Sequence, residues 1–158
     1  MNSTPSAPDT DTLQAERRRV MALVAEASTA ELAAAVEALG SPAHRDLRPA
    51  ESGLVMVRGR IGGDGAPFNA GEATVTRAAI RLADGTTGFS YVLGRDAEKA
   101  RLGAVLDAAV TSGRAEAVET AFCAPVAARL AAERTLAAER TAATRVDFFT
   151  LVRGEDQT

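Results

Sequence analysis

The segment from Arg58 to Glu72 contains the residues best suited to bind an anion. It reads RGRIGGDGAPFNAGE, with glycines at positions 62, 63, 65 and 71 after a predicted strand. Glycine adopts left-handed backbone conformations easily, and successive backbone N–H groups in such a loop can hold phosphate oxygens. However, no Walker lysine follows, and no helix begins directly after the loop to add its dipole. An anion-binding loop and an ordinary turn therefore both stay open.

Arginines recur at alternate positions in the two strands that flank this loop. Arg58 and Arg60 share one face of the first strand, and Arg77 and Arg81 share one face of the second, because residues of equal parity point the same way. If the register aligns them, their guanidiniums gather on one face and need anions or carboxylates to offset their repulsion. A solvated face with local ion pairs explains the pattern equally well. The predicted inward-facing residues are Val55, Val57, Ile61, Ala78, Ile80 and Leu82.

These patterns define one candidate site and exclude several others. The candidate anion-binding or substrate-binding residues are Arg58, Arg60, Gly62, Gly63, Gly65, Thr76 and Arg77. The chain has a single histidine, His44, and a single cysteine, Cys123, whereas a conventional zinc site needs three or four protein ligands. Cys123 stands between Phe122 and Ala124, which favours buried packing over nucleophilic chemistry. No metal ligand set and no catalytic constellation is visible.

The elements that must position these residues are helices at both ends and strands in the middle. Apolar spacing predicts a helix from Leu13, and Ser28 with Glu31 forms a capping box that starts a second helix ending at Gly40. Strands are predicted at 54–61, 73–82 and 86–93, the last two joined by a tight turn at Asp84-Gly85. Asp96 is a predicted N-cap for a helix that closes near Gly113, and further helices are predicted from Glu116 and from Pro125. A fourth strand is predicted at 146–152.

This order predicts an α+β fold with a four-stranded antiparallel sheet and helices packed on one of its faces. The elements run helix–helix, three strands, helices, strand. We predict a disordered N-terminal tail at 1–11, a single domain at 12–154 and a disordered C-terminal end at 155–158. The last strand could pair within the chain or between chains.

Composition places the chain among ordinary globular proteins. Hydrophobic residues make up 46% and charged residues 25%, and one cysteine excludes an internal disulfide framework. The beginning of the chain lacks the pattern of a signal peptide, and no apolar run is long enough to span a membrane, so we expect a cytoplasmic protein. A net charge of −3 argues against electrostatic binding of nucleic acid by the domain as a whole.

Aromatic residues are scarce, at 4% of the chain, and most of them fall near the predicted strands. Phe148 and Phe149 are adjacent, so a strand sends them to opposite faces and one must leave the side that the helices cover. Exposed aromatics of this kind suit a protein interface, although a helix or loop covering the second face explains them as well. The candidate partner-interface residues are Phe68, Tyr91, Arg145, Asp147, Phe148 and Phe149.

Ordered motifs across residues 13–155 give a family resemblance. They include ESGLV from Glu51, RIGGDG from Arg60, GEATVTR from Gly71, GFSY from Gly88, GRD from Gly94 and RVDFFTLVRG from Arg145. In this order they resemble the G subunit family of the carbon–phosphorus lyase core complex (the PhnG family). The motif series is much more specific than any one glycine loop.

The resemblance implies a bacterial accessory subunit of organic phosphonate catabolism under phosphate starvation, in a hetero-oligomer with two copies each of the H, I and J subunits. That complex makes ribose 1-phosphonate 5-triphosphate from MgATP and a phosphonate with release of adenine, chiefly on the I subunit. The iron–sulfur cluster belongs to another subunit, and we expect this chain to bind no cofactor itself. The alternative to this reading is a stand-alone module that binds an anion such as triphosphate.

Overall fold

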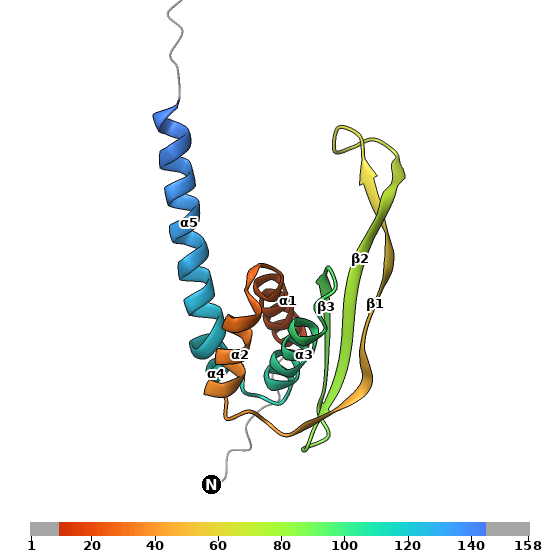
Figure 1. Cartoon of the computed structure of the whole chain (residues 1–158), viewed down its shortest axis with the longest axis vertical. Helices are drawn as coiled ribbons and strands as arrows, with labels where there is room; N and C mark the ends of the chain where they lie inside the picture. Colours follow the sequence, from red (N-terminus) through yellow and green to blue (C-terminus); the bar gives the residue numbers. More distant parts are fainter. Residues whose placement is uncertain (1–9, 145–158) are drawn as a thin grey trace, which may run out of the picture. The chain divides into compact units, whose positions relative to one another are not determined.

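The computed structural model describes residues 10–144, which form helices on either side of a β-sheet segment in the sequence (Figure 1). The helical elements are α1 (Thr10–Glu26), α2 (Thr29–Ala38), α3 (Ala97–Thr111), α4 (Ala115–Val118), the π-helix η1 (Glu119–Cys123) and α5 (Ala124–Ala143). The strands are β1 (His44–Arg60), β2 (Pro67–Leu82) and β3 (Thr87–Leu93). The chain divides into two compact units, one ending at Ala127 and the other beginning at Ala128 within α5. The sheet and every helix before α5 lie in the first unit.

The sheet is antiparallel with the order β1-β2-β3, so the prediction of a four-stranded sheet is wrong. Within residues 10–144, β2 is the central strand and uses both of its edges to pair with β1 and β3. The predicted fourth strand, 146–152, lies outside the described residues. Alternating apolar residues predict an extended local conformation, but they do not say whether that segment joins a given sheet.

Helix α3 packs on one face of this sheet, and α1 and α2 pack on α3 in turn. The inward positions of β2 are buried as predicted: Ala78, Ile80 and Leu82 are at most 6% exposed. On the helix side, Ala104 and Ala108 of α3 approach Gly88 of β3 closely, and both are fully buried. The helices therefore cover one face of an α+β sheet.

The predicted turns and caps are confirmed. Ser28 and Glu31 form the reciprocal capping box of α2, and Gly40 ends that helix region with a φ of +81°. Asp96 caps α3 by accepting a hydrogen bond from Lys99 N at 2.8 Å, and Gly85 has the positive φ that its tight turn needs. Helix α1 begins at Thr10, two residues inside the predicted disordered tail 1–11, whose first nine residues lie outside the described part.

Pro125 does not interrupt the helical turns that precede it. α5 begins at Ala124, and the turn before it is a π-helix in which Ala124 N bonds the carbonyl of Glu119. A proline lacks the N–H for an i→i−4 bond and its ring crowds the carbonyl four residues earlier. The wider π turn gives that ring room, so the chain continues helically where a fresh helix start was predicted.

Candidate functional site

The most unusual surface of the first unit is the outer part of the β1–β2 hairpin, residues 53–75, which we call the hairpin arm. Its register runs from Gly53 opposite Val75 to Arg60 opposite Pro67. Figure 1 shows the two strands continuing past α1, α2 and α3. No helix of the first unit therefore covers either face of the arm for most of its length.

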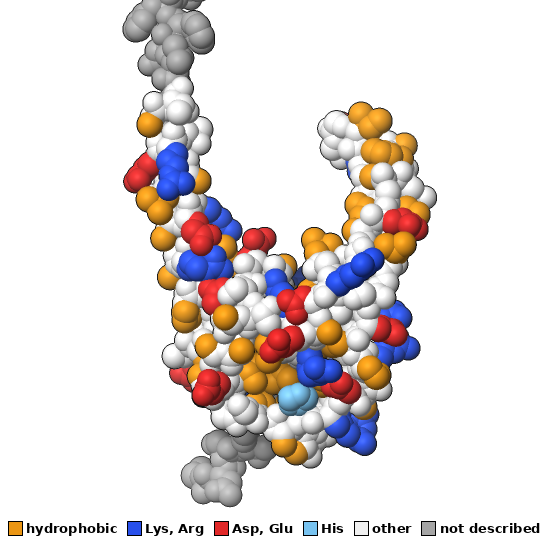
Figure 2. All heavy atoms as spheres, viewed as in Figure 1, with side chains coloured by type: hydrophobic (Ala, Val, Ile, Leu, Met, Phe, Trp, Pro, Cys, Tyr) orange, Lys and Arg blue, Asp and Glu red, His pale blue; other side chains and the backbone are white. Residues whose placement is uncertain are grey.

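Large apolar side chains on the hairpin arm are exposed, and Figure 2 shows hydrophobic side chains along the arm up to its tip. Their exposed fractions are Leu54 63%, Val55 39%, Met56 53%, Val57 43%, Ile61 77% and Phe68 45%. The prediction that Val55, Val57 and Ile61 face the core is thus wrong, because the strands extend beyond the helices that cover the sheet. Residues 54 and 56 share one face and 55 and 57 the other, so both faces of the arm are apolar.

The glycine loop at the tip of the arm is a tight turn. Gly62 and Gly63 have φ of +66° and +88°, and Gly65 N donates to Ile61 O at 3.1 Å. A side chain at Gly65 would place Cβ only 2.6 Å from the same carbonyl oxygen. Arg60 Nη1 donates to Gly65 O at 3.0 Å and so closes the turn. Anion binding by these residues stays a prediction.

The register separates the arginines that were proposed to act together. Arg58 lies opposite Asn69 and Arg77 opposite Glu51, so the two positions are eight residues apart along β2. At about 3.4 Å per residue this is roughly 27 Å, too far for one small anion to bridge. Arg77 Nε donates to Glu51 Oε1 at 2.8 Å, and this hydrogen bond raises the pKa of Arg77.

Thr76 lies on the opposite face of β2 from Arg77 and is fully buried. Its hydroxyl donates to Gly94 O at 2.7 Å and lies 2.8 Å from Ser52 Oγ. These bonds link the middle of β2 to the middle of β1 and to the residue that follows β3. The structure thus places Thr76 in the core and Arg77 on the surface.

The outer face of β3 carries exposed side chains, of which only Tyr91 was a candidate interface residue. Phe89, Tyr91 and Leu93 alternate along the strand and are 49%, 61% and 76% exposed. The inward positions are buried, and two of the three, Gly88 and Ser90, are small. Large side chains at the outward positions and small ones at inward positions form a pattern that is visible in the sequence itself. Phe68 and Tyr91 are both exposed, whereas Arg145, Asp147, Phe148 and Phe149 lie outside the described residues.

Cys123 is buried, at 1% exposure, and burial raises its pKa to about 11. The nearby Glu119 carboxylate adds to this rise, and it is itself bonded by Arg19 Nη2 at 2.9 Å. A thiol with so high a pKa holds little thiolate at neutral pH. Within residues 10–144 no group of three or more His, Cys, Asp or Glu side chains could hold a metal ion, and none of the helices there is long and apolar enough to cross a membrane.

Comparison with known proteins agrees with the motif series. The family described as phosphonate metabolism protein PhnG matches residues 15–154. A relative from Rhizobium meliloti (strain 1021), the alpha-D-ribose 1-methylphosphonate 5-triphosphate synthase subunit PhnG, is 52% identical over 143 residues. The match covers 90% of this chain and 92% of that protein.

Proposed function

Because this chain belongs to the PhnG family of phosphonate metabolism proteins, we propose that it is an accessory subunit of an alpha-D-ribose 1-methylphosphonate 5-triphosphate synthase. The proposed complex contains the H, I and J subunits of the carbon–phosphorus lyase core, two copies of each, together with this chain. In its reaction a phosphonate replaces adenine on the ribose of MgATP. The observation that carries the proposal is the match to a synthase subunit over nearly the whole of both chains.

The hairpin arm supports a role in assembly. A strand with apolar residues on both faces is typical of a strand buried on both sides. Here Leu54 and Met56 on one face and Val55 and Val57 on the other are all exposed. Burying each such side chain against a partner contributes roughly 1.5–3 kcal/mol, so a partner that encloses the arm gains several such contributions. We place the contact with the partner subunits on this arm.

The chemistry of the site favours an accessory role. The single cysteine, Cys123, is buried with a raised pKa. Among the described residues, the ion pairs of Arg17 with Asp107 and of Arg77 with Glu51 join structural elements of the fold. In the proposed complex the groups that break the bond between adenine and ribose come from a partner, and this chain binds no cofactor of its own.

The test is adenine release from MgATP and methylphosphonate by the reconstituted complex. We expect release to fall to background when this chain is omitted and to return when the purified chain is added back. Adenine is measured by chromatography. Undiminished release without the chain contradicts the proposed role.

A second prediction concerns Leu54 on the hairpin arm. Leu54→Glu should lower recovery of the partner subunits with a tagged chain by about tenfold or more, because a carboxylate then replaces an apolar contact at the interface. The melting temperature of the free chain should change by no more than about 2 °C, since Leu54 is 63% exposed.

Leu47 supplies the matched control for this experiment. It is also a leucine of β1 and is 41% exposed, but it precedes the hairpin arm. Leu47→Glu makes the same chemical change and should leave partner recovery near the wild-type level. Equal losses in the two variants would show that the arm is not the contact.

A further inference from the structure

A groove lies at the end of the sheet opposite the glycine loop, where β1 begins and β2 ends. In the register of this end, His44 lies opposite Leu82 and Arg45 opposite Arg81. The groove measures about 440 Å³ and is lined by Ala43, His44, Arg45, Arg81, Leu82, Ala83 and Gly85. Every ionisable side chain in this lining is basic.

Arg45 and Arg81 are direct cross-strand neighbours of like charge, an arrangement that destabilises a sheet when nothing offsets it. Neither guanidinium forms an ion pair with any residue of the described range 10–144. The Nε atom of Arg81 is buried and has no hydrogen-bond partner in that range. A buried donor left without a partner is costly, which points to a missing acceptor.

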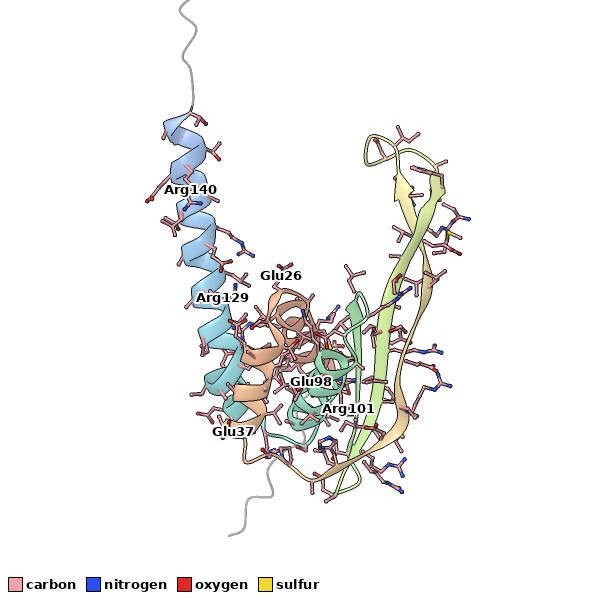
Figure 3. All side chains as sticks on the ribbon, viewed as in Figure 1. Glu26, Glu37, Glu98, Arg101, Arg129 and Arg140 are labelled. Carbon is pink, nitrogen blue, oxygen red and sulfur yellow. The ribbon has the colours of Figure 1, made fainter. Side chains whose placement is uncertain are left out.

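The nearest carboxylates along the chain already accept hydrogen bonds from other residues. Asp46, next to Arg45, accepts hydrogen bonds from Arg101 Nη2 at 3.0 Å and Arg101 Nε at 3.2 Å. Figure 3 labels this arginine on α3, beside the sheet. Asp84, in the turn after β2, accepts from Thr86 N at 2.8 Å. The positive charge of the two guanidiniums in the groove is therefore not offset by these carboxylates.

We propose that this groove is a binding site for a phosphate-type oxyanion. Guanidinium forks match phosphate oxygens in geometry and charge, and two of them facing one groove favour a ligand with more than one negative charge. His44 Nδ1 lies 2.9 Å from Pro42 O, so with that carbonyl accepting, Nε2 donates to an oxyanion when the ring is doubly protonated. The volume suits a short polyphosphate or the phosphate end of a nucleotide.

This site is distinct from the glycine loop and does not depend on the proposed role of the chain in a complex. The loop arginine, Arg60, already donates to Gly65 O at 3.0 Å. Arg45 and Arg81 stand at the other end of the same two strands. Anion binding and subunit assembly are therefore separable properties, and each can be measured when the other is lost.

The experiment is thermal unfolding of the full-length chain in tripolyphosphate, in inorganic phosphate and in potassium chloride of equal ionic strength. Tripolyphosphate at about 100 times its Kd should raise the melting temperature by about 5 °C or more, and chloride should not. Arg45→Gln should abolish the rise. Without anion it should itself melt slightly higher than the wild type, because the repulsion across the strands is gone.

Two further variants keep the test decisive. Arg81→Lys retains the charge but loses the fork and Nε, so it should fold and show a clearly smaller rise. Arg18→Gln removes one positive charge outside the groove and should respond as the wild type does. ATP in place of tripolyphosphate tests whether the ligand is a nucleotide, and a rise with ATP or with free phosphate supports the site.

Three results would overturn the proposal. They are an equal rise in chloride, an unchanged tripolyphosphate response in Arg45→Gln, and loss of the response in Arg18→Gln while Arg45→Gln still responds. Recovery of partner subunits by Arg45→Gln is read in parallel. If Arg45→Gln recovers its partners normally but does not respond to tripolyphosphate, the substitution has affected only the groove. If it loses its partners but responds normally, the substitution has affected only assembly.

Discussion

Replacing Asp107 with alanine is expected to destabilise the folded chain by about 3 kcal/mol, because it leaves the partners of a buried carboxylate unsatisfied. Asp107 is 1% exposed in α3. Its Oδ1 accepts from Arg17 Nε at 2.8 Å, and its Oδ2 accepts from Arg17 Nη2 and from Phe89 N, each at 2.9 Å. One carboxylate thus joins α1, α3 and β3. The expected cost is at the lower end of the range for broken buried pairs because the Arg17 side chain keeps 28% exposure.

The measurement is urea unfolding of Asp107→Ala beside a control on an exposed pair. Asp46 accepts two hydrogen bonds from Arg101, and both side chains are exposed by about a third or more, so Asp46→Ala should cost at most about 1 kcal/mol. Asp107→Asn keeps an acceptor for Phe89 N and should lose less than the alanine variant. Equal losses for Asp107→Ala and Asp46→Ala would show that burial adds nothing at this position.

Local elements were predictable because each rests on a few neighbouring residues. Ser28 with Glu31, Asp96, and Asp84-Gly85 act through bonds to backbone groups within three residues, and all are present. The same reasoning identified the inward positions of β2, where Ala78 and Ile80 are buried. Local chemistry therefore gave the order of the elements up to α5.

The extent of the strands was not predictable, because it depends on pairing between distant residues. β1 begins at His44, ten residues before the predicted strand, and β2 begins at Pro67. The run Leu54–Val57 was interpreted as a core strand, since sequence does not show where a covering helix ends. The structure places this run beyond α3, and the apolar pattern then indicates a surface for a partner.

The candidate site was affected in the same way. Arginine parity was right within each strand, but the longer hairpin shifts Arg58 about eight residues along β2 from Arg77. The same register brings together Arg45 and Arg81, which sequence spacing alone could not pair. The prediction of four strands counted segment 146–152, which lies outside the described residues; within residues 10–144 the sheet has the three strands β1-β2-β3.

Gly88→Ala is expected to be the most damaging glycine-to-alanine substitution in the described part of the chain. The added Cβ would lie 2.1 Å from Ala104 O and 2.6 Å from Ala108 N. Both are backbone atoms of α3, so no side-chain rotation relieves the clash and the helix must move away from β3. We expect a loss of about 3 kcal/mol or more in the free energy of unfolding, measured in urea.

Gly53→Ala is the matched control, because Gly53 also lies in a strand and an added Cβ there meets no atom within 4 Å. It should change the free energy of unfolding by no more than about 0.5 kcal/mol. A Gly88→Ala variant as stable as Gly53→Ala would contradict the close approach of α3 to β3.

The close approach of α3 to β3 also allows Asp107 to bond to β3. Combining the two substitutions therefore gives a sharper test than either variant alone. Phe89 N follows Gly88 directly, and Asp107 reaches it at 2.9 Å only while α3 lies close to β3. If Gly88→Ala pushes the helix outward, that bond is already weakened. Asp107→Ala should then cost clearly less in the Gly88→Ala background than in the wild type, by at least about 0.5 kcal/mol. Strict additivity of the two losses would mean that the glycine and the carboxylate act independently, and that the small residues of β3 do not set the position of α3.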